Sequence, residues 1–158
     1  MENNTVMVTS TSNSTVVLNV PELMLHRTWA RRGATYPFDR RTLMQAYYTP
    51  SVEALFRSGI LITKDVEFLK EVGLIHENGE KEVIELTEQY MLRMIKMMPL
   101  TEVRKELPRL TRAQASELAE FAITHYTELQ MDRIDIIGQY ADKNLLKAIN
   151  HYKLSQEG

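Results

Sequence analysis

Residues 15–41 read TVVLNVPELMLHRTWARRGATYPFDRR, and they combine strand-like runs with a dense cluster of arginines. The β-branched run at residues 15–20 predicts a strand, which the proline after it would end. Partial alternation over residues 22–29 predicts a further strand. Arg32 and Gly33 predict a turn before a short extended piece at residues 34–38.

Another β-branched run lies upstream at residues 5–9, and the polar residues 10–14 separate it from the run at 15–20. Two such runs joined by a short polar loop predict a β-hairpin. The start of the chain also predicts an extended arm whose apolar strand lacks a partner within the chain. We expect such an arm to add a strand to the exposed sheet edge of a neighbouring molecule.

The segment between these runs and Thr87 predicts short elements that begin at a polar cap or end at a glycine. They are helices at residues 40–48, capped by Asp39, at 51–57, and at 65–72, capped by Asp65, with a buried strand at 60–62. Asn78 and Gly79 predict a turn that leads into a returning strand at residues 82–86.

From Thr87 onward the apolar residues follow a helical period. Helices are predicted at residues 87–98, 101–107, 111–126, 132–140 and 142–153. Thr111 and Gln114 fit a capping box. The sequence therefore predicts an α+β protein, with a β-rich subdomain that contains short helices over residues 1–86 and a small all-α helical bundle over residues 87–158.

The first of these helices is rich in methionine. Met91, Met94, Ile95 and Met98 recur at helical spacing, which is typical of a core face. Met97 lies off that face, and a flexible thioether adapts to irregular partners. Met97 is therefore the residue of this helix that we expect at a docking surface.

The charges of the chain are sorted along the sequence. Residues 26–41 hold five arginines and one aspartate, so with His26 neutral the segment carries +4, whereas the whole chain carries −2. The residues expected to contact a partner are Arg27, Trp29, Arg31, Arg32, Tyr36, Arg40 and Arg41. Phosphate, an acidic protein surface and the acidic remainder of the chain itself would all suit such a segment.

Two interpretations of this segment compete with a protein partner. Guanidinium groups beside aromatic planes are common in nucleic-acid binders, which would make the chain an accessory or regulatory protein. The negative net charge counts against that function, because dedicated binders tend to be basic. Alternatively the arginines are solvated, and Trp29 and Phe38 fill a small core.

Most catalytic chemistries lack their local signature in this sequence. There is no cysteine, no glycine-rich phosphate loop and no GxSxG elbow, and the four histidines are too far apart for a zinc pair within one helix. Glu77, Glu80 and their neighbours suit either a cation site or a solvated turn, and the turn is favoured. We therefore predict no catalytic, metal-binding or cofactor-binding residues, and a protein that is not an enzyme.

The arrangement of these parts is similar to that of small phage-encoded virion or assembly proteins. The similarity rests on the polar N-terminal tip, the strand pair around STVVLNVP at residues 14–21, the short segment 52–62 and the compact helical tail. It implies a non-enzymatic subunit whose arm and charged loop engage copies of itself or other particle proteins, in a homo- or hetero-oligomer.

The start of the chain and its apolar runs indicate where the protein is made. No run approaches the roughly 20 apolar residues of a membrane span, and the first residues lack a basic start followed by an apolar stretch. We expect synthesis in a cytoplasm, no membrane partner and, from the resemblance, a place in a virion.

Overall fold

The computed structural model describes residues 4–157, which fall into two compact units, Met1–Glu85 and Leu86–Gly158. Within residues 4–157, helices account for 53% and strands for 16%, with the sheet structure in the N-terminal half. The predicted α+β class is confirmed. Within residues 4–157 no helix has the length and apolar content needed to cross a membrane.

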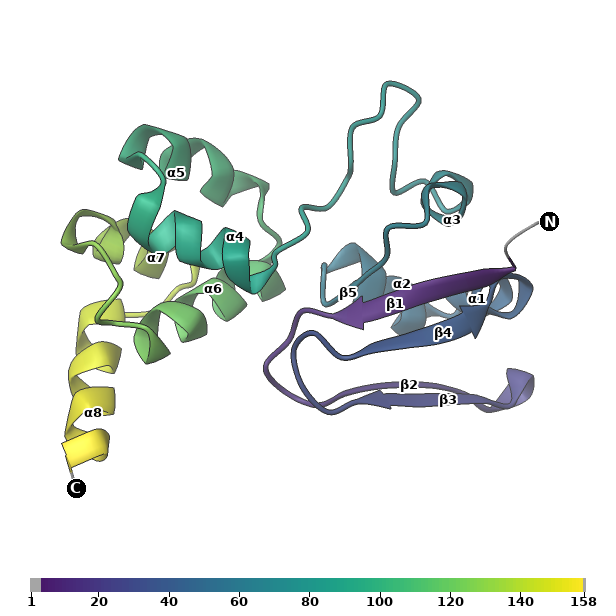
Figure 1. The fold of residues 1–158 in the computed structure, drawn as a ribbon, viewed down its shortest axis with the longest axis horizontal. Coiled ribbons are helices and arrows are strands. Elements are labelled where there is room, and N and C mark those ends of the chain that lie inside the picture. The colour runs from purple at the N-terminus through teal and green to yellow at the C-terminus, as the bar shows by residue number, and fades with distance from the viewer. Residues whose placement is uncertain (1–3, 158) are drawn as a thin grey trace. The chain divides into compact units, whose positions relative to one another are not determined.

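The first unit is built around β1 (Thr5–Ser10). This strand lies in the middle of a three-stranded antiparallel sheet, between β4 (Thr35–Asp39) and β5 (Leu61–Ile62) (Figure 1). Val6 and Val8 alternate with more exposed neighbours and have no exposed area. The β-branched run at the start of the chain is therefore core rather than surface.

The expectation of a partnerless arm is wrong for residues 5–10. β1 pairs with β4 along Thr5–Thr9 on one side and with β5 at Thr9 and Ser10 on the other, so the strand already has partners within the chain. The sequence could not assign these partners, because both lie beyond the next two strands. Residues 1–3 of the predicted arm lie outside the described residues.

The predicted hairpin between residues 5–9 and 15–20 is also wrong. β2 (Val16–Val20) pairs instead with β3 (Leu25–Trp29), through a 3-10 turn at Pro21–Leu23. Met24 completes this turn in the left-handed conformation, with φ 51°, and is 93% exposed.

The polar segment after β1 leads to a second sheet instead of forming a tight turn. Ser10, Thr11 and Ser12 are buried, and the Thr11 hydroxyl donates to the Gly59 carbonyl at 2.7 Å. Buried polar groups require such partners, and here another part of the chain supplies them. This tertiary contact separates β1 from β2.

Trp29 joins the two sheets. Its indole Nε1 donates to the Val8 carbonyl at 3.1 Å, and the ring has no exposed area. It stacks on Phe38 with ring centroids 5.7 Å apart and meets Tyr36 edge-on at 5.9 Å. One side chain of β3 therefore contacts both β1 and β4, which makes it the central contact of the first unit's core.

The open edge of β4 carries a proline. Ser10 N donates to Ala34 O, and Arg40 N donates to Asn4 O, so the hydrogen-bonded pairs of this ladder fall on even positions of both strands. Pro37 lies opposite Met7, between such pairs, and its nitrogen points away from β1. The outer edge of β4 thus has no N–H at its centre.

Three helices complete the first unit: α1 (Arg40–Tyr47), α2 (Pro50–Arg57) and α3 (Val66–Glu71). The predicted caps are confirmed, because the Asp39 carboxylate accepts from Thr42 N at 3.1 Å and the Asp65 carboxylate accepts from Phe68 N at 2.9 Å. The helices bring Tyr47, Phe56 and Phe68 into one aromatic cluster of the core.

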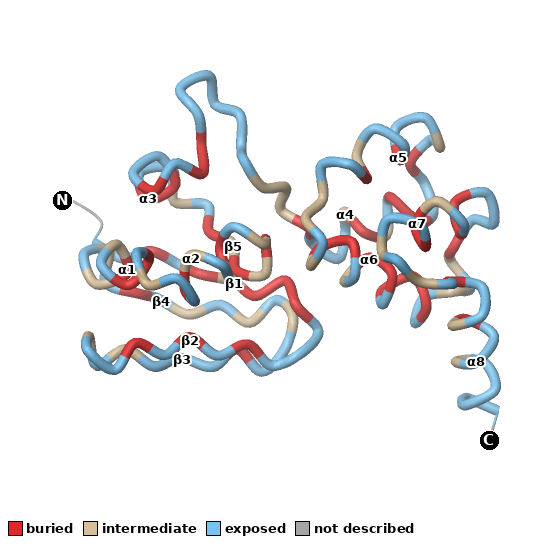
Figure 2. The backbone as a smooth tube through the Cα atoms, turned by 180° about the vertical axis from the view of Figure 1, so that it is seen from behind, coloured by how far each residue is buried: buried red, intermediate tan, exposed pale blue. Residues whose placement is uncertain are grey.

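Residues 76–82, named the acidic turn below, project as a loop after α3 (Figures 1 and 2). His76 N donates to Glu80 O, and Gly79 N donates to His76 O, both at 2.9 Å. An isolated bridge pairs Ile75 with Lys81. The returning strand predicted at residues 82–86 does not form, because the ladder ends at this single bridge.

The second unit is helical. Its helices are α4 (Glu88–Leu92), α5 (Leu100–Glu106), α6 (Arg112–Thr124), α7 (Ile134–Tyr140) and α8 (Leu145–Glu157), with 3-10 turns at Leu107–Arg109 and Met131–Arg133. The predicted capping box of Thr111 and Gln114 is confirmed. Their buried faces form one apolar cluster around Leu118 and Ala122.

A π-helical segment, Arg93–Met97, continues α4 where the sequence predicted an uninterrupted α-helix. Its carbonyls find a partner in Arg133, whose Nη1 donates to Met94 O at 2.8 Å and to Met98 O at 2.6 Å. The Arg133 side chain is 6% exposed, and its Nε donates to Asp132 at 3.0 Å. Met97 is 72% exposed, which confirms its predicted position off the core face.

Replacing Trp29 by alanine is expected to lower the free energy of unfolding of the first unit by about 3–5 kcal/mol, because the change leaves a cavity and removes the hydrogen bond from the indole to the Val8 carbonyl. Urea denaturation followed by circular dichroism measures this loss. Met24→Ala is the matched control, with an expected change within about 0.5 kcal/mol. Equal midpoints for both variants would contradict the role assigned to Trp29.

Replacing Arg133 by methionine keeps most of the side chain's length but leaves the Met94 and Met98 carbonyls without their donor. We expect a loss of about 2–4 kcal/mol in the unfolding free energy of the second unit. The same denaturation measurement applies. Arg112→Met, at an exposed position, should leave the midpoint nearly unchanged. A similar small effect for both substitutions would mean that the π-helical segment does not depend on Arg133.

Candidate interaction surface

The residues predicted to contact a partner lie on consecutive parts of the first unit. Arg27 and Trp29 are on β3, Arg31 and Arg32 are in the connection to β4, Tyr36 is on β4, and Arg40 and Arg41 open α1. The structure therefore places them along the two strands, but it gives them different environments.

Trp29 cannot contact a partner in this structure, because it lies wholly inside the core. The prediction that it is a contact residue is wrong, whereas the expectation that Trp29 and Phe38 fill the core is confirmed. Phe38 is 4% exposed, and Tyr36 is only partly exposed. The aromatic planes that would stack on bases are thus mostly used within the fold.

Arg40 and Arg32 hold parts of the first unit together. Arg40 forms a bidentate ion pair with Asp65, at 2.5 and 2.7 Å, and its side chain is 18% exposed. Arg32 donates from Nε to the Thr11 carbonyl at 2.8 Å. A bidentate pair in a partly buried site is a strong contact, so Arg40 fixes the start of α1 to the start of α3.

Arg27, Arg31 and Arg41 are exposed. The guanidinium of Arg27 lies over the Tyr36 ring, 5.2 Å from its centroid, which holds the side chain across β4 by a cation–π contact. Within residues 4–157, none of the three arginines forms an ion pair with a carboxylate. Their N–H donors remain available to a partner.

Arg41 differs from the other two in its surroundings. It lines an open depression of about 550 Å³ together with Arg40, Asp39, Glu67 and Glu71. Three carboxylates in that depression oppose two guanidinium groups, so it offers no net positive charge to a phosphate. Of the three exposed arginines, Arg27 and Arg31 have no such carboxylates beside them within residues 4–157, and these two residues are named the arginine surface below.

The carboxylates beside these arginines are held in their charged form. The ion pair with Arg40 lowers the pKa of Asp65 below 3.8, with a further contribution from the Phe68 N–H, although burial opposes the shift. The Thr42 N–H and hydroxyl lower the pKa of Asp39, with a smaller contribution from the charge of Arg41. Both side chains therefore serve as caps and counter-ions rather than as proton donors near neutral pH.

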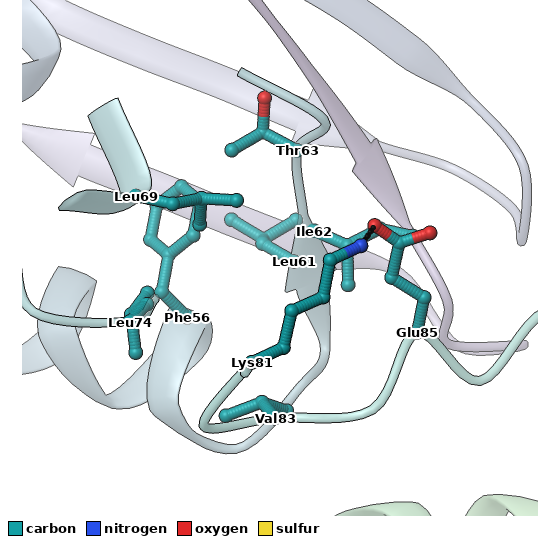
Figure 3. A pocket seen from close by; sticks show the side chains of 9 residues that line it. All are labelled: Phe56, Leu61, Ile62, Thr63, Leu69, Leu74, Lys81, Val83 and Glu85. Carbon is teal, nitrogen blue, oxygen red and sulfur yellow. Dashed lines mark hydrogen bonds and ion pairs between the residues drawn. The ribbon is translucent and has the colours of Figure 1, made fainter. Parts of the chain in front are cut away.

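An apolar cavity of about 30 Å³ lies beside β5 (Figure 3). Phe56, Leu61, Leu69 and Val83 contribute to its lining, and the ion pair of Lys81 and Glu85, at 2.8 Å, closes one side. The volume is about that of one water molecule. It is a small packing defect of the core rather than a substrate site.

Side chains with acid–base chemistry are scattered. Within residues 4–157, no three His, Asp or Glu side chains lie together in a way that could hold a metal ion. His76 pairs with Glu82 at 3.1 Å on the surface, and His125 stacks on Phe121 with ring centroids 3.9 Å apart. Each histidine therefore has a contact within its own local structure.

Tyr90, which pairs with Glu106, is a residue of the second unit with a shifted pKa. The Tyr90 hydroxyl donates to the Glu106 carboxylate, and burial, together with this bond, raises the pKa of the phenol. A phenol with a raised pKa stays protonated at neutral pH and is a poor base. The pair links α4 to the end of α5 and has the character of a structural contact.

Sequence reasoning missed Asp65 as the partner of Arg40 and Arg133 as the donor to the π-helical segment. The sequence marks Asp65 only as a helix cap, and Arg133 resembles any surface arginine. The usable signal for Arg133 was the three isoleucines that follow it, Ile134, Ile136 and Ile137. They place Arg133 at the start of a buried helix.

No protein-family model, curated protein sequence or solved structure matches this chain.

The lowered pKa of Asp65 makes the stability of the first unit depend on pH. A carboxyl whose pKa is lowered by folding stabilises the fold fully above its ordinary pKa of 3.8, and this stabilisation is lost as the pH falls below that value. We expect the urea midpoint of the wild-type chain to fall more steeply than that of Asp65→Asn between about pH 5 and pH 2.5. Asp135→Asn, at an exposed position, should keep the wild-type slope.

Proposed function

We propose that this chain is a non-enzymatic subunit that works by engaging protein partners through the arginine surface. The observation that carries the proposal is the pair of exposed guanidinium groups, Arg27 and Arg31, that no carboxylate of the described chain neutralises. Arg27 is also held in position by Tyr36. A side chain that is already held in place loses less conformational entropy on binding than a mobile one. It also helps to fix the orientation of the partner.

The resemblance to phage-encoded virion and assembly proteins adds a setting. We propose that the partners are subunits of a viral particle or of its assembly machinery, in a homo- or hetero-oligomer. The compact first unit supports such a role, because its core fixes both strands that flank the arginine surface. The strand-adding arm is not part of the proposal, since β1 already pairs with β4 along Thr5–Thr9.

A nucleic-acid partner is the alternative, and the same arginines favour it. Two observations weigh against it. Trp29 and Phe38 are buried, so the stacking planes expected of a single-strand binder are missing from the surface. The depression beside Arg41 contains more carboxylates than cations, which disfavours a phosphate backbone there.

Fluorescence anisotropy separates the two partners. Labelled single- and double-stranded DNA and RNA are titrated with the protein at about 50 mM salt and again at higher salt. For a protein-binding subunit we expect no binding tighter than about 10⁻⁴ M, the weak end of non-specific affinity. Binding that weakens steeply with salt and disappears in the Arg27→Gln, Arg31→Gln, Arg41→Gln triple variant would overturn the proposal in favour of nucleic acid.

A further inference from the structure

The acidic turn is an ordered, exposed projection of negative charge. Residues 76–85 contain four glutamates and one lysine. The lysine, Lys81, is engaged by Glu85, and Glu82 is engaged by the His76 ring. Glu77 and Glu80 are exposed and have no cationic partner within residues 4–157. Two carboxylates at this turn are therefore left to solvent or to another molecule.

The backbone of the turn is fixed before any partner binds. Besides the two hydrogen bonds within the turn, Glu82 N donates to Leu74 O at 2.9 Å, and the Asn78 side chain accepts from Glu80 N at 3.0 Å. Gly79, with φ 87°, supplies the left-handed residue that the turn requires. A preorganised turn presents Glu77 and Glu80 without a large ordering cost.

The acidic turn and the arginine surface belong to the same compact unit but lie far apart on it. In Figures 1 and 2 the turn rises beyond α3, whereas β3 and its connection to β4 lie beyond the opposite side of the three-stranded sheet. The unpaired carboxylates therefore do not reach the unpaired guanidinium groups of their own copy. A second copy can offer its acidic turn to the arginine surface of the first, or its arginine surface to the acidic turn of the first.

We infer that the partner of the arginine surface is a second copy of this chain, which inserts Glu77 and Glu80 of its acidic turn against Arg27 and Arg31. The inference rests on the proposed function and names its partner. The contact joins two different surfaces placed on opposite sides of one unit, so it is heterologous. Repetition of such a contact generates a ring or an open chain of subunits rather than a closed two-fold dimer.

Two neutralised variants test this contact. The double variant Arg27→Gln, Arg31→Gln keeps its acidic turn, and the double variant Glu77→Gln, Glu80→Gln keeps its arginine surface. In sedimentation velocity at about 50 mM salt, we expect the wild-type chain to form species larger than a dimer and to return to monomers at about 1 M salt. Each variant alone should be monomeric, with self-affinity reduced at least about tenfold.

The mixture of the two variants is the decisive sample. Only one productive contact exists in it, between the intact turn of one variant and the intact arginine surface of the other. We expect a 1:1 dimer that grows no further as the concentration rises. The control variant Arg41→Gln, Arg104→Gln removes the same charge from two other exposed positions and should assemble like the wild type. Circular dichroism establishes that each variant is folded.

The remaining outcomes separate this inference from the proposed function. A wild-type chain that stays monomeric at low salt overturns the inference, as does a mixture that sediments as two monomers. If that chain also fails to bind the nucleic-acid probes, the proposed function stands with a different protein as the partner. If it binds them with a steep salt dependence, both the inference and the proposed function are overturned.

Discussion

The first unit depends on the burial of a single indole. Trp29 ends β3, yet its hydrogen bond reaches β1 and its ring lies on β4, so two sheets that share no ladder become one core. A two-stranded hairpin such as β2–β3 is at best marginally stable alone. The contacts of the indole therefore hold the β2–β3 hairpin against the three-stranded sheet. Arg27 lies on this hairpin, so its position on the surface depends on the same contacts.

The five clustered arginines illustrate how one residue type serves two purposes. Arg40 and Arg32 donate to partners within the first unit, Asp65 and the Thr11 carbonyl, and become part of its framework. Arg27 and Arg31 receive no such partner and remain at the surface. The net charge of residues 26–41 thus overstates the positive charge that is available to a partner, because Arg40 and Arg32 are engaged within the fold.

Local features were predictable from the sequence, and non-local ones were not. The caps at Asp39, Asp65 and Thr111 act within one helical turn, so spacing alone identifies them. The pairing of β1 with β4 skips two strands, and hydrophobic alternation cannot rank such partners. Whether Trp29 is core or contact stayed open for the same reason, since burial is decided by the strands that pack over it.

The proline in the β4 edge has a consequence for how this protein behaves when it is concentrated. An edge that lacks a donor at its centre is a poor template for a continuous backbone ladder, so we expect this side of the sheet to seed cross-β fibrils poorly. Association along it is left to side chains, whose attraction responds to ionic conditions. An assembly of the kind proposed above would therefore come apart reversibly, with every subunit still folded.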